Sequence, residues 1–175
     1  MTTPEFSRPH RLDQIGAGDS TLGIEADAGE RAALAERFGL IAIDRLEARY
    51  TLRQDAAGII ARGTLVASVT QSCVVTGESL PATIAEDFAL RFLPEPEGDE
   101  GDEIELDAGE MDTIFYSGGA IDLGEAAAET LALSLDPFPR SSAAAAALKE
   151  AGVLSEEEAG PFGALAGLKD KLKRD

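Results

Sequence analysis

The sequence predicts an α+β domain: a twisted antiparallel β-sheet with flanking helices and a helical C-terminal third. Three observations lead to this prediction. Residues 62–92 hold two alternating stretches joined by a short turn, residues 43–54 alternate in the same way, and segments with helical spacing and capping residues flank these stretches. Runs of strands followed by helices are typical of the α+β class. The pattern leaves open whether the sheet is barrel-like.

The two alternating stretches within residues 62–92 are expected to be neighbouring strands, near residues 59–70 and 80–93. Between them, Gly77 can supply a positive φ and Pro81 begins the returning strand. Each stretch places its apolar side chains on one face: Leu65, Ala67 and Val69 in the first, and Ile84, Phe88, Leu90 and Phe92 in the second.

A third strand is expected near residues 43–54, and its polar face carries a row of arginines. One face holds Leu46, Ala48, Tyr50 and Leu52, and the other holds Arg45, Arg49 and Arg53 with Glu47 and Thr51. A turn at residues 54–58 would bring Arg62 close to this row, because cross-strand neighbours on one face lie about 5 Å apart. Two interpretations remain: the arginines bind RNA or a partner, or they pair with carboxylates and keep the face soluble.

Helices are expected at residues 27–39 and 122–134. Asp27 and Glu30 have the spacing of a capping box, and Gly39 suits the residue after a helix. Asp122 is the expected cap of the second helix, which the prolines from Pro137 onward end. Edge strands are expected from the N-terminus, including residues 5–8, and from residues 112–117.

The C-terminal third is expected to be helical. Ser141 would cap a short helix through Lys149, and residues 161–174 form an amphipathic pattern with Lys169 and Lys173 near its end. These two lysines would complement the helix dipole or contact RNA or a partner. Residues 94–112 are acidic without Lys or Arg, so a mobile loop is expected there. Their spacing does not fit a calcium-binding EF-hand loop.

The bulk composition points to one domain spanning residues 1–175. A net charge of −18 repels nucleic acid and anionic membranes on average, and it attracts basic proteins. The single cysteine excludes an internal disulfide and fits a reducing compartment. The sequence shows no secretory leader or membrane-spanning run, so we expect a cytoplasmic protein that binds neither membrane nor DNA.

Residues for enzymatic chemistry are scarce. Cys73 and His10 are the only cysteine and histidine, and they lie far apart in the sequence, so neither a zinc site nor a Cys–His nucleophile is expected. Phosphate-binding and nucleophile-elbow motifs are also missing from the sequence. We therefore expect no catalytic residues, metal or cofactor, and Cys73 is expected to be structural.

Several segments in fixed order resemble the YceD family of large ribosomal RNA subunit accumulation proteins, in its alphaproteobacterial form. The resemblance covers about residues 5–172. It rests on four segments: residues 71–78 (QSCVVTGE), the strand ending at Phe92 with the acidic tract after it, residues 121–133 (IDLGEAAAETLAL), and residues 137–140 (PFPR). Many relatives carry Cys-x-x-Cys at the first segment, whereas here Thr76 takes the second position. Any metal binding of those relatives is therefore not expected here.

The resemblance implies a non-enzymatic factor that promotes accumulation or processing of large-subunit (23S) ribosomal RNA. Its partner would be the RNA precursor, a basic ribosomal protein, or both. RNA contact would use Arg45, Arg49, Arg53, Arg62, Lys169 and Lys173. The family-motif positions Cys73, Thr76, Asp122, Pro137 and Arg140 are expected to be structural. The alternative from another class is an acidic interaction module, such as a nucleic-acid mimic, that occupies a basic protein unrelated to ribosomes.

Overall fold

The computed structural model describes residues 4–96 and 111–153, and the chain divides into two compact units. The first unit comprises Met1–Gln71 and Pro81–Pro137. The second comprises Ser72–Leu80 and Phe138–Asp175, of which the described part ends at Val153. The predicted helix at residues 161–174 therefore lies outside the described residues, as does most of the predicted acidic loop.

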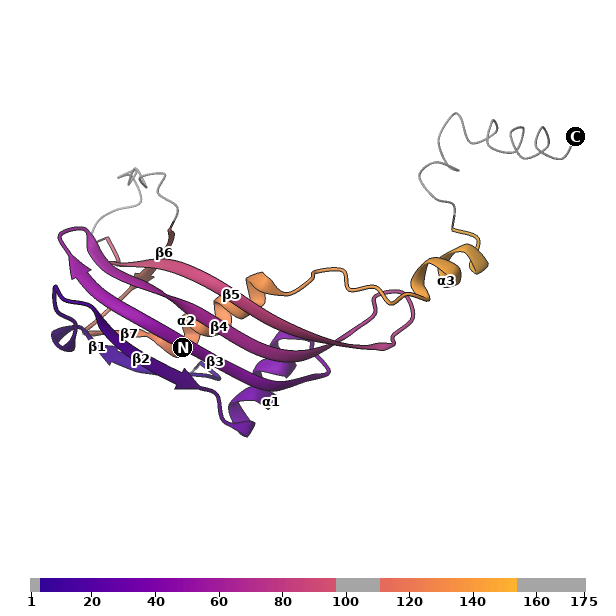
Figure 1. The fold of residues 1–175 in the computed structure, drawn as a ribbon, viewed down its shortest axis with the longest axis horizontal. Helices are drawn as coiled ribbons and strands as arrows, with labels where there is room; N and C mark the ends of the chain where they lie inside the picture. Colours follow the sequence, from indigo (N-terminus) through magenta and orange to yellow (C-terminus); the bar gives the residue numbers. More distant parts are fainter. Residues whose placement is uncertain (1–3, 97–110, 154–175) are drawn as a thin grey trace, which may run out of the picture. The chain divides into compact units, whose positions relative to one another are not determined.

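A five-stranded sheet forms the body of the first unit, with the strand order β2-β3-β4-β5-β6 (Figure 1). The three strands predicted around the arginine row and the central turn are all present, and residues 112–116 form an edge strand as predicted. The bounds are β2 Ser20–Glu25, β3 Ala42–Asp55, β4 Gly58–Ser72, β5 Ser79–Pro94 and β6 Asp112–Tyr116.

Two features of the predicted sheet are corrected. The sheet is mixed, because β6 pairs with β5 in parallel, with Leu90 opposite Asp112 and Pro94 opposite Tyr116. Two parallel strands must be joined by a crossover of about a dozen residues or more. The acidic tract between the end of β5 and the start of β6 is long enough for such a crossover. The sheet is also open rather than a closed barrel, since β2 and β6 are its edge strands among the described residues.

A small second sheet pairs the N-terminal segment with the strand before α2. It consists of β1 (Pro9–Arg11) and β7 (Ala120–Asp122), with His10 opposite Ile121. The N-terminal strand predicted at residues 5–8 is thus wrong in position, and the sequence analysis missed β2 and β7. A short 3-10 turn, η1 (Leu12–Gln14), follows β1.

The first two helices form where their caps predict. In α1 (Ala28–Phe38), Asp27 and Glu30 make both hydrogen bonds of the capping box, and Gly39 ends the helix with a φ of 65°. The third helix, α3 (Ala144–Glu150), lies in the second unit and has Ala143 rather than Ser141 as its N-cap, without a side-chain cap.

The alternation of the central strands has the predicted phase. Leu46, Ala48, Tyr50 and Leu52 are buried on one face of β3, and Leu65, Ala67 and Val69 are buried on the same face of β4. Helix α2 (Leu123–Ser134) supplies Leu123, Ala127 and Leu131 to the same core. The Tyr50 hydroxyl donates a buried hydrogen bond of 2.8 Å to the Leu123 carbonyl, which joins β3 to the start of α2.

Asp122 caps α2 and holds the N-terminal segment at the same time. One carboxylate oxygen accepts hydrogen bonds from the Gly124 and Glu125 amides and from the Arg8 amide, at 2.9, 3.2 and 2.8 Å. The other oxygen accepts from the Ser7 hydroxyl. The predicted cap is confirmed, and the contacts show that it also serves a residue more than a hundred positions away.

We predict that Asp122→Ala lowers the free energy of unfolding by about 2 kcal/mol. It removes an N-cap, worth about 1 kcal/mol, and leaves a part-buried Arg8 amide without its acceptor. Urea unfolding followed by circular dichroism measures the change. Asp122→Asn, which keeps an acceptor oxygen, should lose less. An equal loss in the exposed control Asp87→Ala would contradict the assignment.

Candidate functional site

The predicted arginine row lies on the face of the sheet opposite the core. Arg49 pairs in register with Thr64, Thr51 with Arg62, and Arg53 with Ile60. Directly paired residues of an antiparallel sheet point to the same face, so Arg49, Arg53 and Arg62 share one surface, with Arg62 diagonal to both of the others. All three side chains are exposed. We call these three residues the arginine face.

Arg45 differs from the arginine face, because it forms an ion pair. Its guanidinium donates two hydrogen bonds of 2.8 Å to the Glu47 carboxylate on the same strand. An exposed pair of this kind adds little to stability, but it partly neutralises the charge of Arg45. Within the described ranges, no ion pair or side-chain hydrogen bond engages Arg49, Arg53 or Arg62.

Two shallow hollows accompany the arginine face. One, of about 240 Å³, is lined by Arg53 and Arg62 together with Asp19, Thr51 and Ile60. The other, of about 630 Å³, borders Arg49 and is lined by the neighbouring threonines and by Gly23, whose missing side chain leaves room beside Arg49. Thr51 lines both hollows. The face therefore offers three guanidinium groups next to hydroxyl groups and open space.

The contribution of β2 to this surface was not predicted from the sequence. Gly23 and Thr21 lie opposite Arg49 and Thr51 in the β2–β3 register. The alternation of residues 20–25 (STLGIE), with Leu22 and Ile24 half-buried, was the signal that could have identified this strand. The predicted contacts at Lys169 and Lys173 lie outside the described residues.

The family-motif turn at Cys73 belongs to the second unit and is closed by backbone hydrogen bonds. The Cys73 amide donates to the Glu78 carbonyl at 2.8 Å, and the Gly77 amide donates to the Cys73 carbonyl at 2.9 Å. Gly77 has a φ of 74°, which confirms the positive φ expected there. The Val74 amide donates to the Pro139 carbonyl at 2.9 Å, so the turn packs on the PFPR segment.

The Cys73 sulfur is buried and is surrounded by hydrogen-bond donors. The Ser141 and Thr76 amides lie 3.3 and 3.5 Å from Sγ. A hydrogen bond from the Thr76 side chain, followed by the backbone of Ser141, lowers the pKa of Cys73 from 9.0 to about 6, although burial opposes the shift. Ser141 was not predicted as a neighbour of Cys73, because a contact between residues 68 positions apart leaves no local pattern.

The remaining motif positions are spread over both units. Pro137 is exposed at the end of the first unit, and Arg140 is exposed in the second. Among the residues that the structure describes, no three His, Cys, Asp or Glu side chains lie close enough to hold a metal ion. In the same residues, no helix is both long enough and apolar enough to cross a membrane.

We predict that Thr76→Val raises the pKa of the Cys73 thiol, because it removes the hydroxyl that lowers this pKa most. The ultraviolet absorbance of the thiolate as a function of pH measures this pKa, with Ser72→Ala as the control.

The same shift makes stability depend on pH. Because the pKa of Cys73 in the folded state lies below its unfolded value, the thiolate stabilises the folded state above about pH 9. This stabilisation is lost as the pH falls through about 6. An unshifted pKa in Thr76→Val would contradict the assignment.

Comparison with known proteins identifies a family. No curated protein and no solved structure matches the chain significantly. One family model does, described as "Large ribosomal RNA subunit accumulation protein YceD", and it matches residues 61–169, which is more than half of the chain. The matched region includes Arg62, β5, α2 and the turn at Cys73. The chain belongs to the YceD family, whose name associates it with the accumulation of large-subunit ribosomal RNA.

Proposed function

We propose that this chain is a non-catalytic, cytoplasmic factor in large-subunit biogenesis that binds the precursor of 23S ribosomal RNA through the arginine face. The observation that carries the proposal is the set of three exposed arginines on one surface, none of which forms an ion pair with a described residue. Membership of the YceD family supports a role in the accumulation of large-subunit ribosomal RNA. The arginine face is the surface that we propose contacts this RNA.

Guanidinium groups suit this role, because each can donate two parallel hydrogen bonds to a phosphate. The register places Arg62 diagonal to both Arg49 and Arg53. Diagonal side chains lie about 7–8 Å apart at their bases, and arginine side chains are long enough to reach successive phosphates from there. The neighbouring threonine hydroxyls can donate further hydrogen bonds to phosphate or ribose oxygens.

The net charge of −18 sets a limit on this interaction. At long range the protein repels RNA, but at physiological ionic strength the Debye length is only about 8 Å. Local contacts can therefore dominate once the arginine face meets the RNA. We expect modest affinity that weakens steeply with salt, because each phosphate contact releases counterions.

We predict that replacing Arg49, Arg53 and Arg62 together by Ala weakens binding to large-subunit precursor transcripts. The slope of log affinity against log salt should become shallower by about two to three, because each of the three lost phosphate contacts contributes about 0.7–0.9 to this slope. Fluorescence anisotropy across a salt series measures both quantities. The protein should remain folded, because these side chains point away from the core.

A matched control removes the same charge elsewhere: Arg11, Arg140 and Lys149 are exposed and do not belong to the arginine face. Their triple replacement by Ala should leave the salt slope unchanged. Equal weakening in both variants would show a nonspecific charge effect and contradict the assignment to the arginine face. If the wild-type protein fails to bind the transcripts at low salt, the RNA proposal is wrong.

In cells, we predict that the wild-type protein co-sediments with immature large-subunit particles and that its deletion lowers large-subunit RNA. Sucrose gradients with blotting for the protein and probing for 23S RNA measure both effects. The triple arginine variant should restore large-subunit RNA less well than the control triple. A protein that stays at the top of the gradient, with unchanged RNA in the deletion, would contradict the proposed role.

A further inference from the structure

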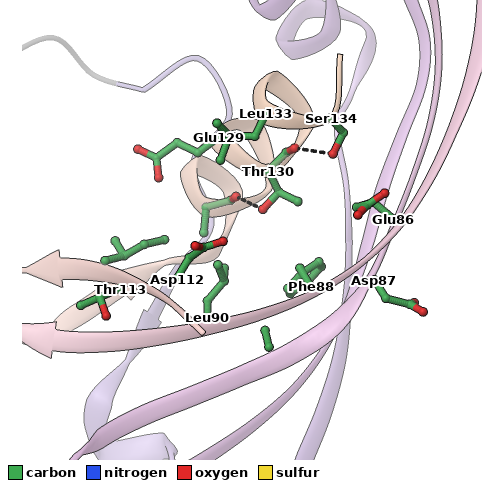
Figure 2. Close-up of a pocket in the computed structure, with 13 residues that line it drawn as sticks. Glu86, Asp87, Phe88, Leu90, Asp112, Thr113, Glu129, Thr130, Leu133 and Ser134 are labelled. Carbon is green, nitrogen blue, oxygen red and sulfur yellow. Dashed lines mark hydrogen bonds between the residues drawn. The ribbon is translucent and has the colours of Figure 1, made fainter. Parts of the chain in front are cut away.

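A groove of about 710 Å³ lies between α2 and the strands β5 and β6, on the core side of the sheet (Figure 2). Its lining includes the apolar side chains Phe88, Leu90, Ile114 and Leu133. Leu133 is 81% exposed, although its neighbours in α2 are largely buried. Leu133 thus extends the apolar lining to the surface, and an exposed apolar patch rimmed by polar residues is typical of an interaction site.

The groove has carboxylates on all three elements and no cation among its lining residues. Glu86 comes from β5, Asp112 from β6 and Glu129 from α2, while the adjacent Asp87 points away from the helix (Figure 2). Partial desolvation and then the neighbouring Glu125 raise the pKa of Glu129. Arg37, which does not line the groove, partly opposes this shift. The charged residues that line the groove are therefore all carboxylates, which attract cations.

The two hydroxyl groups that α2 contributes to the groove already form hydrogen bonds within the helix. The Thr130 hydroxyl donates to the Ala126 carbonyl at 2.9 Å, and the Ser134 hydroxyl donates to the Thr130 carbonyl at 2.8 Å (Figure 2). The site therefore presents carboxylates and apolar surface, but few free donors. Phosphate groups would be repelled, so nucleic acid does not suit this groove.

We propose that this groove binds a short, lysine- or arginine-bearing apolar segment of a partner protein. The apolar side chains of the partner segment would lie on Phe88, Leu90 and Leu133. The lysines or arginines of the segment would lie beside Glu86, Asp112 and Glu129. Charge complementarity selects this occupant, because a basic amphipathic segment is the partner whose two kinds of side chain both find a counterpart. The site is separate from the arginine face, so the inference is independent of the RNA contact.

The test measures binding of a fluorescent leucine–lysine amphipathic peptide of about four helical turns to the full chain. A leucine–glutamate peptide of the same pattern serves as the probe control. We expect saturable binding of the basic peptide only, weakening as salt rises. Glu86→Gln with Glu129→Gln should weaken it about tenfold, since each exposed ion pair contributes a few-fold in affinity. Leu133→Ser should weaken it several-fold without unfolding the protein.

Matched controls keep the outcome interpretable. Glu36→Gln with Glu78→Gln removes the same charge from exposed positions outside the groove, and Ile41→Ser removes another exposed apolar side chain. Both should bind the peptide as the wild type does, and so should the triple alanine variant of the arginine face. Equal weakening by the groove and control variants would overturn the proposal. Tighter binding of a peptide with the sequence of residues 161–174 would also overturn it, in favour of this chain's own segment.

Discussion

The hydrogen bonds accepted by the Asp122 carboxylate join the N-terminal segment of the first unit to the start of α2. The carboxylate accepts the amides that begin α2 and also binds Ser7 and Arg8, so the helix start and the N-terminal segment are held by one side chain. Arg8 in turn contacts Glu30 through two hydrogen bonds and thereby links this point to the capping box of α1. The Tyr50–Leu123 hydrogen bond joins the same region to the centre of the sheet.

The backbone packs closely at Gly63, which lies between Arg49 of β3 and Phe88 of β5. A Cβ at Gly63 would lie 1.8 Å from the Arg49 carbonyl and 2.8 Å from the Phe88 ring, so only glycine fits. The Phe88 ring can then pack on Tyr50, with 5.0 Å between their centroids. Phe88 also lines the acidic groove. The backbone of Arg49 and the Phe88 ring of the groove therefore both pack against Gly63.

The two surfaces of the sheet have opposite chemistry. The arginine face offers guanidinium groups and hydroxyls, which suit phosphates, whereas the groove beside α2 offers carboxylates around apolar side chains, which suit a basic segment. Precursor ribosomal particles combine an anionic RNA with basic proteins. The two proposals therefore assign the two components to different surfaces, so a strongly acidic composition and a local RNA contact do not conflict.

The sequence by itself determined the features that depend on local patterns: the three central strands and their buried faces, the two capped helices, the exposed arginine row and the family. Periodicity and capping report which side of an element is buried, so these predictions needed no long-range contact. Tertiary structure alone decided the parallel pairing of β6, the open sheet, the pairing of Arg45 with Glu47, the donors around Cys73 and the acidic groove. These depend on which distant segments meet, because chain direction and side-chain partners leave no periodic signal in a single sequence.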